Sequence, residues 1–227
     1  MPATPAASLR PSLTIQPLTL DDVPTMCEIE AAAFAPSPVG ALIYPNGRGP
    51  STSDAMAYRF RKLLNDPSKA FAYPLKVVRE DTGEMVTFGV WIRPLTAEER
   101  QVVKDKAAAG PDPEAPVDEA MDKEFMSAFR KEMGASHERT MGDRPHWYLE
   151  LLVTHPRHQG IGAGGAIIRW GLQKAREDKV TAYLESSAAG FKVYEHMGFK
   201  TIGEVRVWDG KAVLPCMEWT PERLQSE

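Results

Sequence analysis

The sequence predicts an α/β protein built around one mixed sheet, and two observations predict this class. Residues 146–220 alternate strand patterns with helical patterns and close on two consecutive strand patterns. Upstream, β-branched and aromatic residues predict three more strands, at residues 13–19, 71–81 and 84–94. Strands separated by helices, followed by strands that succeed each other directly, are typical of a sheet with both parallel and antiparallel neighbours.

The N-terminal elements support this class in chain order. After the first strand, residues 20–35 and 51–66 have apolar side chains at helical spacing, and each begins near a capping residue. The Pro/Gly-rich residues 36–51 between them predict a loop. An Asp/Thr/Gly turn joins residues 71–81 to residues 84–94, so these two strands are expected to form a hairpin.

The C-terminal elements are the most regular. The expected strands are residues 146–153, 180–187, 200–208 and 214–220, and the expected helices run from a glycine-rich loop to about residue 178 and over residues 189–198.

The chain predicts a single domain at residues 13–227, preceded by a flexible tail at residues 1–12 that is rich in Pro, Ala and Ser. Residues 95–145 interrupt it with two charged helical patterns on either side of a Pro/Gly segment. This stretch has too few apolar residues for its own core, so it is expected to be a charged helical insertion and not a second domain.

Composition excludes several classes of protein. The net charge of −4 and the absence of a long Lys/Arg run argue against a nucleic-acid partner, and no apolar window is long enough for a membrane span. The N-terminus lacks the pattern of a secretory signal. Cys27 and Cys216 are far apart in sequence and form no CxxC motif. These features predict a reducing compartment, the cytoplasm or the nucleus, and no metal site.

The glycine cluster at residues 157–165, RHQGIGAGG, lies between a predicted strand and a predicted helix. Gly160, Gly162 and Gly165 fit the dinucleotide pattern G-x-G-x-x-G, and Glu185 follows at the end of the next strand. An NAD(P)-dependent oxidoreductase is therefore one hypothesis. The six polar residues before the first glycine and the few residues that remain after it are unfavourable for a doubly wound sheet.

The same residues also fit the pattern [QR]-x-x-G-x-[GA], which occurs twice, beginning at Arg157 and at Gln159. Bare backbone N–H groups in such a loop, at the positive end of a following helix, would bind a pyrophosphate. Side chains at the glycine positions would block that approach.

Residues 147–200 resemble the core of the GNAT superfamily of acyl-CoA-dependent N-acyltransferases, and most closely its small fungal-type members. The resemblance rests on a strand, the motif PxxxxGxGxG, a helix, a strand and the final helix motif YExxGF. It implies a mostly antiparallel sheet of six to seven strands with helices on both faces. Two splayed parallel strands, containing LELLV and TAYLES, would form the acyl-CoA cleft.

The resemblance also implies a set of residues that bind acetyl-CoA, which is a co-substrate here. Main-chain groups of three strand residues would hold the pantetheine arm, and the glycine loop would hold the diphosphate. Ser187 would replace the Asn that many members place before the last helix. The implied residues are Leu152, Val153, Thr154, Arg157, Gln159, Gly160, Ile161, Gly162, Ala163, Gly164, Gly165 and Ser187.

The resemblance implies that an amine attacks the thioester. Direct attack in a ternary complex is favoured because no Cys stands where a covalent acyl relay would be expected; Cys216, on a late strand, is the one residue that weakens this argument. Tyr194 matches the tyrosine that protonates the leaving thiolate in similar enzymes. The base that takes the amine proton stays open between Glu150 and His146, which would share a strand face unless a bulge changes the alternation.

The resulting hypothesis is an N-acetyltransferase that uses acetyl-CoA and a primary amine, either of a small molecule or of a protein. The alternatives are a catalytically degenerate CoA-binding protein and the oxidoreductase described above. Neither a membrane nor a nucleic-acid partner is expected. Homodimers are common among similar proteins, but the sequence identifies no interface.

Overall fold

The computed structural model describes residues 11–222, so most of the predicted tail at residues 1–12 lies outside the described residues. Seven strands form one sheet in the order β1-β2-β3-β4-β5-β7-β6. Only β4 and β5 pair in parallel, and every other neighbouring pair is antiparallel. The strands are β1 (Leu13–Pro17), β2 (Ala72–Arg79), β3 (Met85–Ile92), β4 (His146–Thr154), β5 (Thr181–Glu185), β6 (Lys200–Val207) and β7 (Ala212–Trp219).

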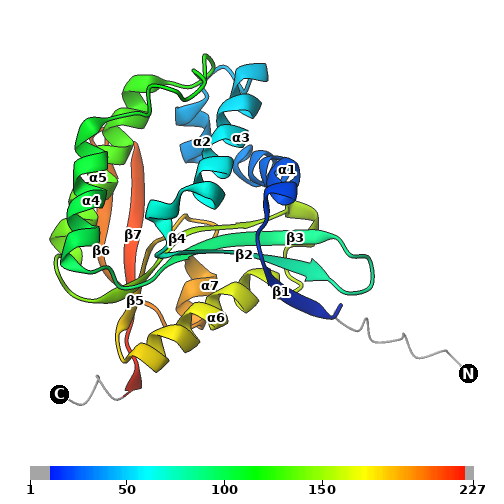
Figure 1. Ribbon diagram of the computed structural model, residues 1–227, viewed down its shortest axis with the longest axis vertical. Coiled ribbons are helices and arrows are strands. Elements are labelled where there is room, and N and C mark those ends of the chain that lie inside the picture. Colours follow the sequence, from blue (N-terminus) through cyan, green and yellow to red (C-terminus); the bar gives the residue numbers. More distant parts are fainter. Residues whose placement is uncertain (1–10, 223–227) are drawn as a thin grey trace, which may run out of the picture.

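Helices cover both faces of this sheet (Figure 1). On one face lie α1 (Val23–Phe34), α2 (Pro38–Ile43), α3 (Pro50–Asn65), α4 (Ala97–Ala109) and α5 (Lys123–Thr140). On the other lie α6 (Ala163–Asp178) and α7 (Phe191–His196). Short 3-10 turns occur at Leu20–Asp22, Pro67–Lys69 and Pro156–His158. The predicted fold class, a mixed and mostly antiparallel sheet with helices on both faces, is confirmed.

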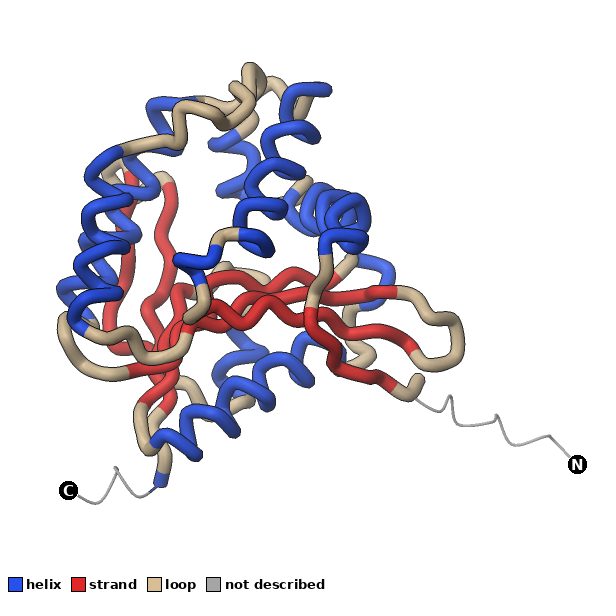
Figure 2. The backbone as a smooth tube through the Cα atoms, viewed as in Figure 1, coloured by secondary structure: helices blue, strands red, loops and turns tan. Residues whose placement is uncertain are grey.

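The core consists of three apolar clusters, one on the face of the sheet that α6 and α7 cover and two on the other face. One lies between the sheet and helices α6 and α7, one between the sheet and helices α1 and α3, and one between α5 and strands β5 to β7 (Figure 2). Trp91 and Ile167 are fully buried in the first cluster. Phe60 and Phe88 are buried in the second, and Phe125 and Cys216 in the third. The β6–β7 hairpin is steeply inclined to strands β1–β4, and α5 packs alongside this hairpin (Figure 1).

The two parallel strands separate after a short paired stretch. β4 pairs with β5 only from His146 to Tyr148, where Tyr148 lies opposite Tyr183. From Leu149 onward β4 pairs with β3 alone. The expected splay between two parallel strands is therefore present. Over the rest of its length, one edge of β4 has no neighbouring strand within residues 11–222.

One segment predicted as a loop contains a helix. Within residues 36–51, α2 runs from Pro38 to Ile43. Its first turn is stabilised because the Ser37 side chain accepts a hydrogen bond from Gly40 N at 3.2 Å, and Pro38 stands at the first helical position, where a missing N–H costs nothing. The sequence prediction took Pro and Gly as loop residues, whereas here they begin a helix.

The two helices predicted in residues 95–145 exist and differ in their environment. No residue of α4 is buried. In contrast, α5 buries Phe125 and Ser136 against the β6–β7 hairpin, and Met141 directly after it is also buried. Because of this packing, α5 forms part of the third core cluster and brings polar side chains of its C-terminal half to the point where β4 and β5 separate.

Candidate functional site

The unpaired edge of β4 exposes specific main-chain groups. His155 N donates to Val86 O on β3 at 3.0 Å, and main-chain groups alternate between the two edges of a strand. The N–H and C=O groups of Leu152 and Thr154 therefore face the open edge. Those of Val153 face β3, so in this register Leu152 and Thr154, and not Val153, offer free main-chain groups to a pantetheine arm.

The glycine loop leads from this edge into α6. Gly160 and Gly162 have φ of +80° and +94°, a conformation that glycine adopts without strain, and Gly162 is the N-cap of α6. The first hydrogen bond of the helix runs from Ala166 N to Gly162 O. Among the described residues, no group accepts a hydrogen bond from the N–H groups of residues 160–165. These donors lie at the positive end of a 16-residue helix.

Close packing places this loop beside the open edge. A Cβ on Gly164 would lie 3.3 Å from Thr154 Oγ1, so the start of α6 passes directly over the end of β4. Ile161 packs half-buried against the core, and the Ala163 side chain is buried in it. These two contacts fix the loop to the core. Arg157 and Gln159 are exposed. The predicted cofactor residues from Leu152 to Gly165 therefore lie along one continuous path.

Arg169 is a further cation near this path, and sequence analysis did not single it out. Its guanidinium lies 3.2 Å from the position that a Cβ of Gly165 would occupy, so the side chain folds back toward the start of α6. No carboxylate among the described residues pairs with it. The only sequence signal was an Arg two turns into the helix, which is also typical of an ordinary solvated position.

Glu150 lies at the bulge of β4. Val90 pairs with Leu151 and Trp91 with Leu149, so Glu150 is the additional residue on the β4 side. The side chain reaches solvent, yet protein atoms surround it closely enough that desolvation raises the pKa of its carboxyl; Lys69 and Arg59 oppose that effect. A carboxyl group with a raised pKa, accessible from outside, is suited to accept a proton.

His146, the other candidate base, has both ring nitrogens in hydrogen bonds. Its Nδ1 lies 2.7 Å from Arg144 O, and its Nε2 lies 2.9 Å from Nε2 of His137 on α5. His146 also begins β4, at the end of the strand where it pairs with β5, whereas the bulge lies beyond the point of separation. Glu150, and not His146, therefore lies beyond the point where β4 and β5 separate.

A buried acidic group lies where the strands part. Tyr148 Oη donates to Glu185 Oε2 at 2.9 Å, and the Glu185 side chain is only 2% exposed. Burial, together with the charge of Glu150, raises the pKa of Glu185. Sequence analysis considered Glu185 only as a ribose ligand of the dinucleotide alternative, and it did not single out His137, which belongs to a charged helical pattern.

Tyr194 lies on α7, on the face of the sheet opposite to α5 (Figure 1). Its ring is buried against Phe199 with a centroid distance of 5.8 Å, and burial raises the pKa of its phenol. Its hydroxyl makes no hydrogen bond within the described residues and is not among the fully buried polar atoms. A neutral phenol with an unused, accessible proton is suited to be an acid.

Ser187 follows β5 and is exposed. Its Oγ accepts a hydrogen bond from Gly190 N at 3.2 Å, which shapes the turn into α7. The hydroxyl hydrogen remains free to donate. Ser187 therefore holds this turn and keeps a hydroxyl hydrogen that a ligand could accept.

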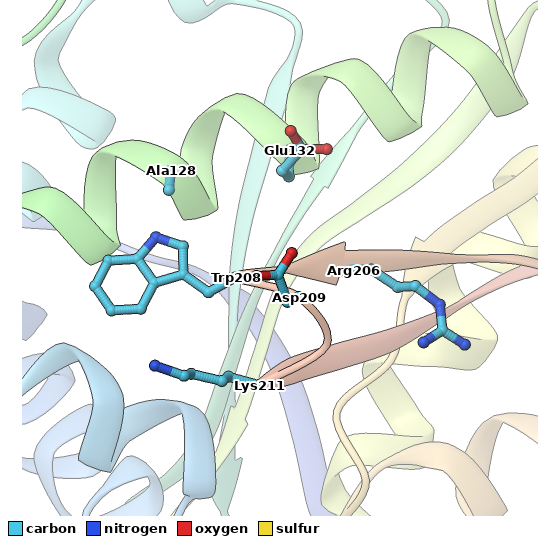
Figure 3. A pocket seen from close by; sticks show the side chains of 6 residues that line it. All are labelled: Ala128, Glu132, Arg206, Trp208, Asp209 and Lys211. Atoms are coloured by element: carbon cyan, nitrogen blue, oxygen red, sulfur yellow. The ribbon is translucent and has the colours of Figure 1, made fainter.

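A charged hollow of the surface lies away from these residues. A cavity of about 500 Å³ lies between α5 and the turn that joins β6 to β7, as Figure 3 shows, and its lining is mostly charged. Lys211, Arg206, Asp209 and Glu132 contribute both signs of charge. Within residues 11–222, no group of three or more His, Cys, Asp or Glu side chains is arranged to hold a metal ion, and no helix is long and apolar enough to cross a membrane.

Comparison with known proteins agrees with the fold. The family model described as the acetyltransferase (GNAT) domain matches residues 98–220, which is more than half of the chain. The chain belongs to the GNAT acetyltransferase family.

A relative from Stachybotrys chartarum described as an acetyltransferase is 28% identical over 199 residues, which cover 83% of this chain and 80% of the relative. Among solved structures, polyamine N-acetyltransferase of Drosophila melanogaster, which forms N-acetylagmatine, has a TM-score of 0.60 at 11% identity and covers 92% of this chain and 100% of its own. PaiA N-acetyltransferase of Thermoplasma acidophilum in complex with coenzyme A has a TM-score of 0.52 at 14% identity, with 92% and 99% covered. At these identities the structural likeness shows the fold alone.

Proposed function

We propose that this protein is an N-acetyltransferase that transfers the acetyl group of acetyl-CoA to a primary amine by direct attack in a ternary complex. The proposal rests on one observation: the free main-chain groups at the edge of β4 lead directly into the free N–H groups of the glycine loop. The open edge of β4 at Leu152 and Thr154 continues into the unpaired N–H groups of residues 160–165. An extended arm that contains amides can pair with a free strand edge, and a diphosphate at the end of that arm can bind to the N–H groups at a helix N-terminus.

The residues present fit coenzyme A in chemistry. Leu152 and Thr154 would pair with the pantetheine amides as a strand would, and residues 160–165 would donate to the diphosphate. Arg157 and Arg169 supply cations on either side of the loop, and Ser187 has a hydroxyl hydrogen to donate near the end of β5. Since the arm would run from the loop back along β4, its thioester would lie at the bulge, beside Glu150.

The base in this proposal is Glu150. It accepts the proton that the acceptor amine loses, and the nitrogen lone pair then forms the new bond to the thioester carbonyl carbon. His146 is less suited because both of its nitrogens are engaged. Tyr194 donates its phenolic proton to the departing thiolate. Holding the two reactants together at the bulge can contribute on the order of 7–11 kcal/mol.

Direct transfer is favoured over an acyl-cysteine intermediate. Cys216 is fully buried on β7 with its Sγ 3.5 Å from Ser136 Oγ. Cys27 lies on α1, half-buried, and burial raises the pKa of its thiol, which disfavours the thiolate.

The acceptor class is proposed as an amine because the relatives that match in fold include enzymes that act on polyamines and agmatine. The oxidoreductase alternative loses support, since a doubly wound parallel sheet is absent from residues 11–222 and the described sheet contains a single parallel pair. A degenerate CoA-binding protein remains the second candidate, because Ser187 stands where many members have Asn.

Thiol release measured over a panel of small amines, amino acids and peptides tests the proposal. The expected result is release of free CoA that depends on both acetyl-CoA and at least one amine, with acetylated amine as the product. Binding of acetyl-CoA without release with any acceptor would support the degenerate alternative and contradict the proposed function.

A further inference from the structure

Cationic side chains gather on the face of the sheet that carries Glu150. Arg59 lies on α3, Lys69 in the 3-10 turn that follows α3, and Arg130 on α5. The charges of Lys69 and Arg59 act on the Glu150 carboxyl, and the charge of Arg59 also acts on Arg130. These four groups therefore share one region, and α3 and α5 stand on the same face of the sheet at its borders (Figure 1).

The direction of Arg130 follows from its position in α5. Arg130 precedes His137 by seven residues, which is two turns of helix, so the two side chains project from nearly the same side of α5. The His137 ring lies against the rings of Tyr148 and Tyr183, with centroid distances of 4.5 and 5.0 Å, where β4 and β5 separate. Arg130 therefore projects from the side of α5 that faces these two strands, about 10 Å nearer the start of the helix.

Arg130 is a cation without a carboxylate to balance it. No Asp or Glu side chain among the described residues forms an ion pair with Arg130 or with Lys69. The guanidinium of Arg130 reaches solvent, yet protein atoms surround it closely enough that desolvation, together with the charge of Arg59, lowers its pKa. Neighbouring cations repel each other, and burial adds to that cost. A bound anion would relieve both effects.

The acidic side chains on this side of the molecule already have partners. Glu30 on α1 forms an ion pair with Nη2 of Arg59, and the Arg59 side chain is still 52% exposed, so the rest of its guanidinium stays accessible. Asp118 is buried and accepts hydrogen bonds from Tyr44 Oη at 3.1 Å and from Thr52 Oγ1 at 2.9 Å. Neither carboxylate is therefore free to pair with Arg130.

We propose that the acceptor is a primary amine that also carries an anionic group, a carboxylate or a phosphate, which Arg130 and Arg59 bind while the amine lies at Glu150. This inference rests on the proposed function and narrows its acceptor class. A guanidinium presents parallel N–H donors that match either anionic group, and such charge-assisted hydrogen bonds are stronger than neutral ones. The acetyl transfer itself is unchanged, because the anion binds away from the reacting atoms.

The same charges disfavour an acceptor with a second cation. Polyamines and agmatine, on which two proteins of similar fold act, carry a positive group at the end far from the reacting amine. In this protein that group would lie near Arg130 and Arg59, and like charges repel. This chain is therefore expected to discriminate against the acceptors of those two proteins.

Matched acceptors test the charge preference with the full-length protein. γ-Aminobutyrate, its neutral amide and the diamine of the same length differ mainly in the charge of the distal group. Shorter and longer sets of the same design and a set of α-amino acids with their amides vary the spacing, and phosphoethanolamine against ethanolamine tests phosphate. In the set with the best acceptor, kcat/KM for the anionic amine should exceed that for the neutral one by about tenfold or more. A neutral amine or a diamine as the best acceptor of the whole panel would overturn the proposal.

Arg130→Gln tests whether the guanidinium causes the preference, and Arg139→Gln is the matched control. Arg139 lies nine residues later on α5, hence on the opposite side of the helix, and it is exposed. Arg130→Gln should raise the KM for the anionic amine by about tenfold, with the KM for its neutral partner and for acetyl-CoA within about twofold. Arg130→Glu should make the diamine a better acceptor than the acid. Equal effects on the acid and the amide, or an equal effect of Arg139→Gln, would contradict the assignment.

A binding measurement separates this inference from the proposed function. Calorimetric titration of the protein saturated with CoA needs no turnover, and it should show the anionic amine binding about tenfold more tightly than its amide, a difference that Arg130→Gln removes. Acetylation of amines with equal binding of acid and amide would refute the anion site alone. Absence of thiol release with every amine would refute the proposed function instead.

Discussion

The Trp91 indole occupies the space where a side chain of Gly171 would begin. A Cβ on Gly171 would lie 2.0 Å from Trp91 Cε2, and the indole N–H donates to Ile167 O one turn earlier in α6 at 3.0 Å. This contact fixes α6 against β3. Because the first turn of α6 carries the free N–H groups, the contact also sets where those donors lie relative to β4.

Gly171→Ala should therefore destabilise the protein, by about 1–3 kcal/mol or more, because the indole must move out of a filled space. Gly134→Ala is a matched control in α5, where a Cβ would meet no atom within 4 Å. It should stabilise the protein by about 0.5–1 kcal/mol through helix propensity. Urea unfolding of both variants measures the difference, and equal effects of the two substitutions would contradict this packing account.

Gly162→Asp should raise the KM for acetyl-CoA by about tenfold or more, because it places a negative charge and a strained φ where a diphosphate would bind. Gly83→Asp controls for backbone strain, since Gly83 has φ of +71° in the turn between β2 and β3, with open space around it. Steady-state kinetics distinguish the two. A similar change in KM in both variants would attribute the effect to strain and not to the loop.

Tyr194→Phe should lower kcat by about 10²-fold or more while acetyl-CoA binding stays constant, since only the proton donor is removed. The free energy of unfolding should change by less than about 0.5 kcal/mol, because the lost hydroxyl makes no hydrogen bond in the described residues. Turnover equal to that of the wild type would remove Tyr194 as the acid.

Stability should fall as the pH falls from about 6.5 toward 4, through His137. Its folded pKa of about 4 lies below the unfolded value near 6.5, so the unfolded chain binds more protons in this interval. The raised pKa values of Glu150 and Glu185 act in the opposite direction, so the comparison must isolate the histidine. Melting temperatures against pH should decline less in His137→Gln than in the wild type, by the equivalent of about 1–3 kcal/mol. Parallel curves would show that the ring titrates normally.

The sequence predicted the parts of the fold and site that depend on local patterns. The strands, the glycine loop and the start of α6 follow from residues adjacent in the chain, and so does the family resemblance of residues 147–200. The short helix α2 did not follow, because Pro38 and Gly40 occur in loops as readily as in a first helical turn.

The buried polar groups could not be predicted for a different reason. The contact of His137 with Glu185 depends on how α5 lies across the sheet, and the approach of Tyr148 to Glu185 depends on the register of β4 with β5. The bulge at Glu150 also changes which side chains face the cleft, and no local residue pattern specifies it. All three features are tertiary properties.

Calorimetric titration with acetyl-CoA, and in parallel with S-acetylpantetheine, tests the central claim most directly. If the N–H groups of residues 160–165 bind the diphosphate, acetyl-CoA should bind with a micromolar Kd, and the ligand without the diphosphate should bind about 100-fold more weakly or not measurably, a loss of about 2.7 kcal/mol. Equal affinity for the two ligands, or no heat with acetyl-CoA, would contradict the account.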